Sequence, residues 1–148
     1  MASQQLVTAK ARKGFTLVEL AVVIVIIGVL AAFGVPRFLK SVERAKAAEA
    51  FSYLSAVRAA QERYNARQGT YASDLTVLDI KLQAPKYFTV GPVGPGLSGS
   101  VQDTWSLTLT RTGASAGYGP YTVTFTDGGF DKNNSTIANM PDINPMGD

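Results

Sequence analysis

Residues 15–36 read FTLVELAVVIVIIGVLAAFGVP and contain a single charged residue, Glu19. From Leu20 to Val35 the sequence is uncharged and almost wholly apolar. At about 1.5 Å of rise per residue, a helix of this length spans roughly 30 Å, which is the thickness of the hydrocarbon core of a bilayer. The apolar residues follow no amphipathic period, so the helix would be apolar on every side. We therefore expect residues 15–36 to form a membrane-spanning helix.

Charge is distributed unevenly on the two sides of this segment. Residues 1–14 contain Lys10, Arg12 and Lys13 and no acidic residue, whereas residues 69–148 contain seven acidic and four basic residues. Because positively charged flanks stay in the cytoplasm, the part that follows the apolar segment is expected to cross the membrane. The formal net charge of +3 hides this acidic C-terminal half, which disfavours nucleic acid as a partner of that half.

The 148 residues include no cysteine and no histidine. A chain without cysteine has no disulfide framework, no zinc–thiolate site and no thiol nucleophile. Without histidine it lacks the commonest general base, so serine- and cysteine-protease sites are excluded. The seven aspartates of residues 69–148 are scattered and form no paired-carboxylate motif. We therefore expect no enzymatic activity and predict no catalytic residue.

Glu19 is the unusual residue of the apolar segment. A carboxylate costs about 2.5–3.5 kcal/mol at the centre of a bilayer, and ionisable groups in such helices usually have a function. A cleaved secretory signal fits the basic leader, but its small-residue cleavage site around Ala31 and Gly34 is poor. A permanent anchor fits the length equally well. Neither interpretation gives Glu19 a partner, so we expect it to find one inside the membrane or inside an assembly.

The run KGFTLVE, residues 13–19, resembles the class III signal of type IV pilins and type II secretion pseudopilins. The resemblance implies that a prepilin peptidase cuts between Gly14 and Phe15, which removes 14 residues and leaves 134 of the 148. It also implies that Phe15 is then N-methylated and that Thr16 and Glu19 act in assembly.

The same resemblance implies a partner for Glu19. Cleavage would create an α-amino group at Phe15, whose positive charge would pair with Glu19 of a neighbouring subunit. In a low-dielectric environment, loss of one partner strands the other at a cost of roughly 3–5 kcal/mol. The pair would therefore fix the axial register of the subunits.

Gly28 and Pro36 lie where the family has a helix-breaking glycine and proline. The resemblance implies a stretch between them that unwinds in the filament and makes it extensible. A simpler interpretation fits the same residues, because glycine allows close helix packing and proline produces a harmless kink. The residues alone do not separate these two interpretations.

Residues 37–68 contain no glycine or proline and are rich in good helix formers. One stripe recurs at spacings of three and four: Ala47, Ala50, Phe51, Leu54, Val57, Gln61 and Tyr64. The stripe predicts an amphipathic helix that ends before Gly69 and forms the spine of a head domain covered by a sheet. The basic residues at its start would lie near lipid head groups or opposite acidic residues of adjacent heads: Arg37, Lys40, Arg44 and Lys46.

Residues 69–148 contain the strand patterns. Residues 75–80 would hold a short helical turn capped by Ser73 or Asp74. Residues 86–90 are a candidate first strand, followed by a Gly/Pro-rich connection over 91–100. Residues 105–110 and 121–126 alternate strictly, which predicts antiparallel strands with one buried face and one wettable face of serine and threonine. The expected buried set is Trp105, Leu107, Leu109, Tyr121, Val123 and Phe125.

The tail, residues 127–148, is rich in Asp, Asn, Gly and Pro. Oxygens of Asp127, Asp131, Asn133 and Asn134 could bind calcium, and the resemblance adds that some secretion-system relatives bind calcium in this region. The spacing lacks the central glycine pattern and the bidentate glutamate of an EF-hand loop. We therefore expect an ordinary turn region without a cofactor, with calcium as the alternative. Many members of the family close this region with a disulfide, which this chain cannot form.

These patterns predict an α+β chain with a leader (1–14), a transmembrane and filament-core helix (15–36), an amphipathic helix (37–68) and a β-sheet head (69–148). The resemblance implies a structural subunit, a major pilin that polymerises into a type IV pilus filament. The alternatives are a major pseudopilin of a type II secretion system and a membrane-anchored binding module that forms no polymer. The precursor would lie in the bacterial inner membrane, with its leader cytoplasmic and its head periplasmic, and an assembly platform would move it into an extracellular pilus.

Overall fold

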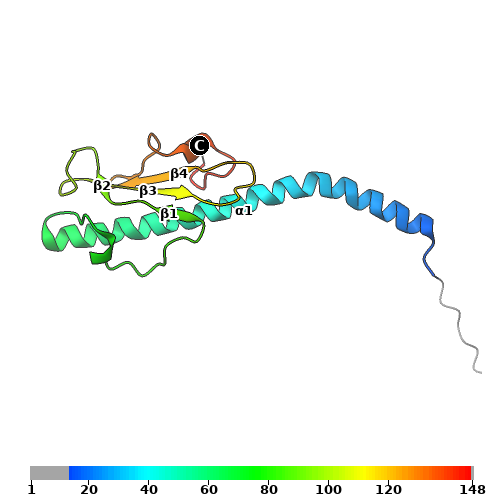
Figure 1. The fold of residues 1–148 in the computed structure, drawn as a ribbon, viewed down its shortest axis with the longest axis horizontal. Helices are drawn as coiled ribbons and strands as arrows, with labels where there is room; N and C mark the ends of the chain where they lie inside the picture. The colour runs from blue at the N-terminus through cyan, green and yellow to red at the C-terminus, as the bar shows by residue number, and fades with distance from the viewer. Residues whose placement is uncertain (1–13, 148) are drawn as a thin grey trace, which may run out of the picture. The chain divides into compact units, whose positions relative to one another are not determined.

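A long helix precedes a small antiparallel sheet in the computed structural model, which describes residues 14–147 (Figure 1). The α-helix α1 spans Leu17–Gln68, and two short 3-10 helices, η1 and η2, span Leu75–Val77 and Thr136–Asn139. The strands are β1 (Phe88–Val90), β2 (Gly94–Pro95), β3 (Trp105–Arg111), β4 (Thr122–Thr126) and β5 (Gly129–Phe130). The predicted α+β class is confirmed.

The chain divides into two compact units, the first ending at Pro36 and the second beginning at Arg37. The described part of the first unit is the apolar beginning of α1. The second unit, called the head below, comprises residues 37–147 as described and contains the rest of α1 and the sheet. Most of the predicted leader, residues 1–13, lies outside the described residues.

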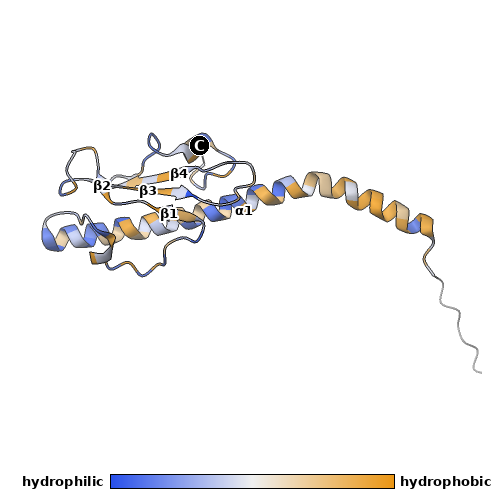
Figure 2. Cartoon of the chain, in the orientation of Figure 1, coloured by the Kyte–Doolittle hydropathy of each residue, from blue (hydrophilic) through white to orange (hydrophobic). Residues whose placement is uncertain are grey.

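Phe15 and the apolar part of α1 expose their large side chains in the single chain. Phe15, Leu17 and Phe33 are 78%, 86% and 74% exposed. By length and composition α1 is long and apolar enough to cross a membrane. Figure 2 shows the apolar colour over this part of the helix, whereas polar and apolar residues alternate in the head.

The C-terminal end of α1 is set by a glycine. Gly69 follows the last helical residue, Gln68, and has a positive φ of 75°. Its backbone N–H donates to the carbonyl of Asn65 over 2.7 Å, which satisfies one of the free carbonyls of the last turn. The predicted helix end is confirmed. The predicted short turn is also present, since the Asp74 carboxylate caps η1 by accepting from the Thr76 N–H over 2.8 Å.

The sheet has the order β1-β3-β4-β5, with β2 also paired to β3, and the pairings described are antiparallel. In the central pair, Leu107 lies opposite Phe125 and Leu109 opposite Val123. The three predicted strands are confirmed as β1, β3 and β4. The two-residue strands β2 and β5 were not predicted, because Gly94–Pro95 and Gly129–Phe130 are too short to show an alternating pattern. They are strands only through their pairing with β3 and β4.

One face of this sheet packs on the amphipathic half of α1 (Figure 1). All six predicted inward side chains of the two long strands are buried, and so is the helix stripe from Ala47 to Gln61. The rings of Phe51 and Phe125 meet edge to face, with centroids 5.7 Å apart. Each large side chain contributes about 1.5–3 kcal/mol when it is fully buried, so this contact is the main source of head stability.

The opposite face of the sheet is less wet than predicted. Thr124 of β4 is only 3% exposed, because the tail crosses it. The Thr124 N–H donates to the Ser135 hydroxyl over 2.8 Å, and the Thr124 hydroxyl donates to the Asn134 carbonyl over 2.9 Å. The prediction of an open threonine–serine face is therefore wrong at Thr124, because hydroxyl alternation cannot reveal that a later segment covers it.

We expect Leu54→Ala to lower the free energy of unfolding of the head by about 2–5 kcal/mol, because Leu54 is fully buried and the truncation leaves a cavity. Leu97→Ala is the matched control, because Leu97 is 96% exposed and its loss should change stability by less than about 0.5 kcal/mol. Denaturant unfolding can be followed by the fluorescence of Trp105, the single tryptophan of the chain. Equal effects of the two variants would contradict the described core.

Candidate functional site

The first turn of α1 is closed by a reciprocal pair of hydrogen bonds between Thr16 and Glu19. The Thr16 hydroxyl accepts from the Glu19 N–H over 3.2 Å, and the Glu19 Oε2 accepts from the Thr16 N–H over 2.8 Å. The Thr16 hydroxyl also donates to Glu19 Oε2 over 2.9 Å. This is a capping box, which satisfies two backbone donors that the first turn leaves free.

The capping box explains why these two residue types stand three apart at the helix start. It was not predicted, although a Thr-x-x-Glu pattern before an apolar run is its usual signature. The box begins at Thr16, directly after Phe15, and holds the Glu19 carboxylate at the exposed N-terminal end of the apolar helix. Its negative charge is favourable there because the N-terminus of a helix carries partial positive charge.

Gly28 and Pro36 both lie inside α1. A Cβ added at Gly28 would meet no atom of the described residues within 4 Å. Packing within the described chain therefore gives no reason for a glycine at this position. The unwinding of the stretch between Gly28 and Pro36 in a filament stays a prediction, because the single chain is helical through both residues.

A buried charge cluster joins α1 to the sheet in the head. Glu43 of α1, Arg111 of β3 and Tyr121 next to β4 are at most 2% exposed. Arg111 Nε donates to Glu43 Oε1 over 2.6 Å, and Arg111 Nη2 donates to Glu43 Oε2 over 3.1 Å. The Tyr121 hydroxyl donates to Glu43 Oε1 over 2.9 Å. A bidentate pair of this kind has strong geometric specificity.

The remaining donors of the guanidinium are used by backbone carbonyls. Arg111 Nη2 donates to the Ala114 carbonyl over 2.6 Å, and Nη1 donates to the carbonyls of Thr112 and Tyr87. The ring of Phe88 lies 5.9 Å from the guanidinium carbon. The charges are thus compensated inside the head, as buried charges must be.

Burial disfavours the ionised form of Glu43, but the hydrogen bonds from Arg111 and Tyr121 and the positive charge of Arg111 outweigh it, so its pKa lies below the ordinary value. The hydrogen bond to Glu43, partly offset by burial, raises the pKa of Arg111. Burial and the bond to Glu43 raise the pKa of Tyr121. The cluster is therefore an ion pair with a neutral tyrosine at neutral pH.

This cluster was not predicted, although the patterns contained it. Glu43 lies four residues before Ala47 and so falls on the helix stripe, and Arg111 lies two residues after Leu109 and so falls on the inward face of its strand. Both are charged, and a pattern of apolar residues therefore does not include them.

Two of the basic residues at the start of the head have acidic partners within the head. Lys40 Nζ lies 2.5 Å from a carboxylate oxygen of Asp142, and Lys46 Nζ lies 3.4 Å from Glu43 Oε2. Neither lipid head groups nor an adjacent head is needed to balance these two charges.

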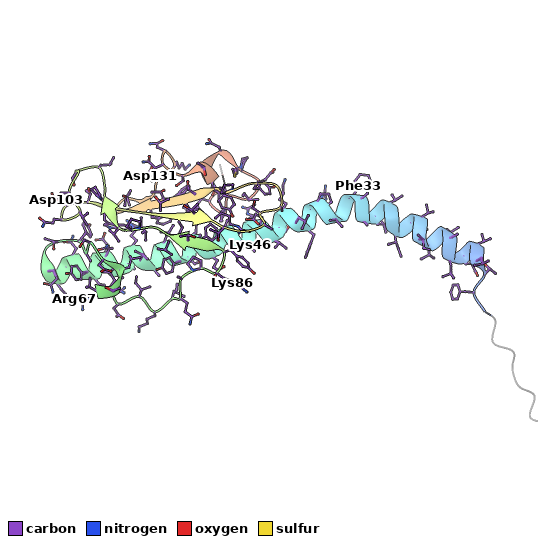
Figure 3. The ribbon with its side chains drawn as sticks, in the orientation of Figure 1. Phe33, Lys46, Arg67, Lys86, Asp103 and Asp131 are labelled. Carbon is purple, nitrogen blue, oxygen red and sulfur yellow. The ribbon has the colours of Figure 1, made fainter. Side chains whose placement is uncertain are left out.

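Asp131, one of the tail residues proposed as calcium ligands, is engaged in local hydrogen bonds. Asp131 lies on the side of the sheet away from α1 (Figure 3). Its Oδ1 accepts from the N–H groups of Asn133 and Asn134 over 3.0 and 3.2 Å, and its Oδ2 accepts from the Asn134 side chain over 2.7 Å. The Asp127 carbonyl accepts from Arg58 Nε over 2.8 Å. Within residues 14–147, no three Asp or Glu side chains gather as a metal site would require, and calcium stays a prediction.

The N-terminal part of the chain matches known sequences. A family model described as the prokaryotic N-terminal methylation motif matches residues 9–35, a segment that contains the predicted cleavage site and Glu19. The type IV major pilin protein PilA of Myxococcus xanthus is 42% identical over 60 residues, which cover 40% of this chain and 27% of that protein. The type IV narrow pilus major component PilA5 of Thermus thermophilus is 54% identical over 48 residues, which cover 32% of this chain and 41% of that protein.

A secretion protein is similar as well. The type II secretion system core protein G of Pseudomonas aeruginosa is 35% identical over 74 residues, which cover 50% of this chain and 52% of that protein. The chain thus spans between about a quarter and about half of the length of these relatives. No solved structure matches. The resemblance to type IV pilins and type II secretion pseudopilins is confirmed.

Glu43→Gln should lower the free energy of unfolding at neutral pH by about 3–5 kcal/mol, because it leaves Arg111 buried without its counter-charge. The pKa of Glu43 is lower in the folded state than in the unfolded state. The ionised Glu43 carboxylate therefore stabilises the fold fully above the ordinary glutamate pKa of about 4.3. This stabilisation is lost as the pH falls through the pKa that Glu43 has in the folded state. The difference between variant and parent should therefore shrink below about pH 4. Denaturant unfolding between about pH 3 and about pH 8 measures both effects.

Lys40→Ala is the control for this prediction. It removes the exposed ion pair with Asp142 and should cost less than about 1 kcal/mol at every pH in the range. A pH-independent loss in Glu43→Gln, or a loss no larger than that of Lys40→Ala, would contradict the role of the cluster.

Proposed function

We propose that this chain is a major pilin, the structural subunit of a type IV pilus filament. The observation that carries the proposal is the apolar helix, exposed in the single chain, with Glu19 in its first turn and within the matched methylation motif. The similarity to major pilins of two organisms supports it. The role proposed is structural, and neither a catalytic group nor a cofactor takes part in it.

Processing and assembly would proceed in a fixed order. A prepilin peptidase cuts between Gly14 and Phe15, and the new amino-terminal Phe15 is N-methylated. Residues 15–36 then hold the subunit in the inner membrane, with the head periplasmic, until an assembly platform moves it into an extracellular filament. The membrane and the filament core both offer the apolar surrounding that this helix needs on every side.

In the filament, the ammonium group of Phe15 in one subunit would pair with Glu19 of its neighbour. The pair is poorly screened in a dry helix bundle, so a subunit in the wrong axial position leaves two charges without partners. Only the correct stagger satisfies both charges, and the pair selects it.

The capping box is compatible with this pairing. A carboxylate can accept about four hydrogen bonds, and the bonds described from Thr16 use Oε2 only. Thr16 would therefore orient the carboxylate within its own subunit, and the neighbouring ammonium would approach the remaining lone pairs. This gives Thr16 a positioning role in assembly.

The second candidate function is that of a major pseudopilin of a type II secretion system. The similarity to core protein G favours it, since that match covers half of each chain. Both candidates use the same helix and the same Glu19 chemistry, and they differ in where the polymer is found. A membrane-anchored binding module without a polymer is the remaining alternative, and it gives Glu19 no partner.

Mass spectrometry of the mature protein tests the processing. We expect a chain of 134 of the 148 residues that begins with N-methyl-Phe15. A chain that begins at Ala32 or beyond would show ordinary signal-peptidase cleavage, and an uncut chain would show a permanent anchor. Either result would contradict the proposed processing.

Substitutions of Glu19 and Thr16 separate the effect of the Glu19 charge from the effect of the capping box. Glu19→Gln keeps a side-chain oxygen that accepts from Thr16 but removes the charge, so we expect normal membrane insertion and fibre yield reduced at least about tenfold. Glu19→Val should insert equally well and assemble as poorly. Thr16→Val keeps the charge but removes the hydroxyl, and we expect an intermediate yield.

Electron microscopy of the cell surface, with immunoblots of membranes and sheared fibres, measures these yields. Surface fibres that disappear when the chain is deleted would support the pilus, whereas loss of protein secretion without loss of fibres would support the pseudopilus. Fibre yield in Glu19→Gln equal to that of the parent would remove the proposed role of the charge.

A further inference from the structure

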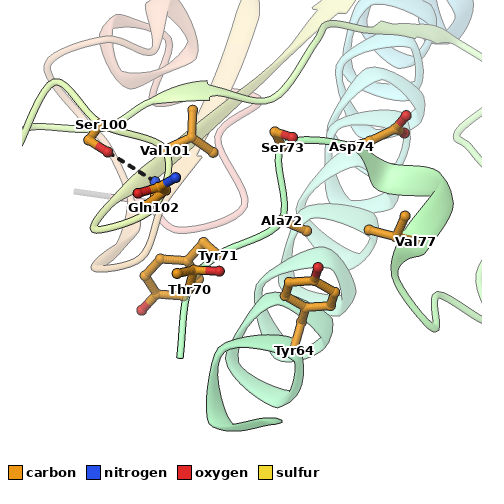
Figure 4. Close-up of a pocket in the computed structure, with 10 residues that line it drawn as sticks. All are labelled: Tyr64, Thr70, Tyr71, Ala72, Ser73, Asp74, Val77, Ser100, Val101 and Gln102. Carbon is orange, nitrogen blue, oxygen red and sulfur yellow. Dashed lines mark hydrogen bonds between the residues drawn. The ribbon is translucent and has the colours of Figure 1, made fainter. Parts of the chain in front are cut away.

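A cavity of about 580 Å³ lies in the head at the C-terminal end of α1 (Figure 4). Three segments form its walls: the last turns of α1 with Tyr64, the loop and η1 over residues 70–77, and the turn over residues 100–102. Its volume lies within the range of about 300–1,000 Å³ that small-ligand sites occupy in proteins. Neither the apolar residues 15–36 nor the buried charge cluster contributes to it.

Two tyrosines from different segments supply the aromatic surface of this cavity. Tyr64 and Tyr71 are both half-buried, so part of each ring stays accessible. The Tyr71 hydroxyl donates to Glu62 Oε1 over 3.2 Å, which fixes the direction of that ring. A half-buried tyrosine offers a flat apolar face beside a polar group.

Polar groups surround the two rings. The polar residues that line the cavity are Asp74, whose carboxylate also caps η1, and Gln102, Thr70, Ser73 and Ser100. The ten lining residues, all within the described part of the chain, include one carboxylate and no Lys or Arg. The cavity therefore offers many donors and acceptors but no positive charge.

The walls are held in place before any ligand binds. Gln61, which is fully buried, donates from Nε2 to the Ala72 carbonyl and accepts the Ala72 N–H at Oε1, both over 2.8 Å. The Tyr71 N–H donates to the Gln102 carbonyl over 3.2 Å, which joins the second wall to the third. A preformed site loses less entropy on binding than one that must first be ordered.

The composition of the walls selects the ligand class. An anion would meet the Asp74 carboxylate without a compensating cation, and a metal ion would find a single acidic ligand. A wholly apolar ligand would leave the hydroxyl and amide groups unpaired. A ring with weakly polar C–H faces and hydroxyl groups at its edge matches both the tyrosine faces and the polar rim.

We propose that this cavity binds a neutral sugar ring, stacked on Tyr64 or Tyr71 and hydrogen-bonded to the groups of its rim. The proposal goes beyond the assembly function and does not depend on polymerisation, because the head alone forms the cavity. In a filament, every subunit would carry one such site, so weak single contacts would add up to strong attachment to a glycan-coated surface.

The experiment uses the full chain in micelles of a detergent whose head group is neither a sugar nor choline. The probes are methyl β-galactoside, methyl α-mannoside and N-acetylglucosamine, with choline as a cationic probe and inorganic phosphate as an anionic one. Saturation-transfer NMR gives the dissociation constants. We expect at least one of the sugars to bind in the millimolar range, and choline and phosphate to bind more weakly than that sugar.

Variants locate the binding. Tyr64→Ala and Tyr71→Ala should each weaken sugar binding by about tenfold, the loss expected for an aromatic contact. Tyr71→Phe keeps the ring and should stay close to the parent. Gln102→Leu removes a polar group of the cavity rim at an exposed position without touching the core, so it should weaken sugar binding even if the alanine variants fold poorly. Tyr87→Ala, which removes a tyrosine outside the cavity, is the matched control.

Absence of binding by all three sugars would overturn the proposal. So would sugar binding that Tyr64→Ala, Tyr71→Ala and Gln102→Leu all leave unchanged, or choline binding tighter than any sugar. Sugar binding by a chain that forms no fibres would support this inference and refute the proposed function, so the two fail independently.

Discussion

The apolar surface of residues 20–35 is the constraint on which the rest of the molecule depends. Its large side chains are exposed on every side of the helix in the single chain, so lipid or other copies must cover them. An apolar surface without pattern is satisfied equally well at many axial positions. In the proposed filament, Glu19 would remove that freedom, because a charge in such a surrounding is stable only opposite its counter-charge. Under this proposal, hydrophobic burial would supply the attraction between subunits, and one carboxylate would supply their axial register.

In the head, too, an ion pair adds direction to an apolar contact that has none. Leu54, Val57 and their neighbours would pack on the sheet in more than one position, since apolar contact is not directional. The bidentate pair of Glu43 and Arg111 is directional, and Tyr121 adds a third element to it. We interpret this cluster as the device that fixes where the sheet lies along α1, at a cost in desolvation that well-packed apolar residues would not have.

The sequence allowed most of the fold to be predicted, because hydrophobic period and glycine position are local signals. The helix stripe, its end before Gly69 and the inward faces of β3 and β4 follow from spacing alone. The contacts that the sequence did not predict join distant residues. Asn134 and Ser135 cover Thr124, and Glu43 meets Arg111 across 68 positions of the chain. For the candidate site, the motif of residues 13–19 identified Glu19, but the bonds that orient its carboxylate were found only in the structure.

The tail is fastened to β4 by hydroxyl and backbone groups, through Ser135 on Thr124 and Thr136 on Thr122. No sulfur takes part in this closure, since the sequence contains no cysteine. The native head is therefore indifferent to glutathione and to disulfide-forming catalysts, and it can reach the same state in a reducing cytosol as in an oxidising compartment. Maturation of this chain needs no thiol chemistry, and engineered cysteines would report on its contacts without competition from native ones.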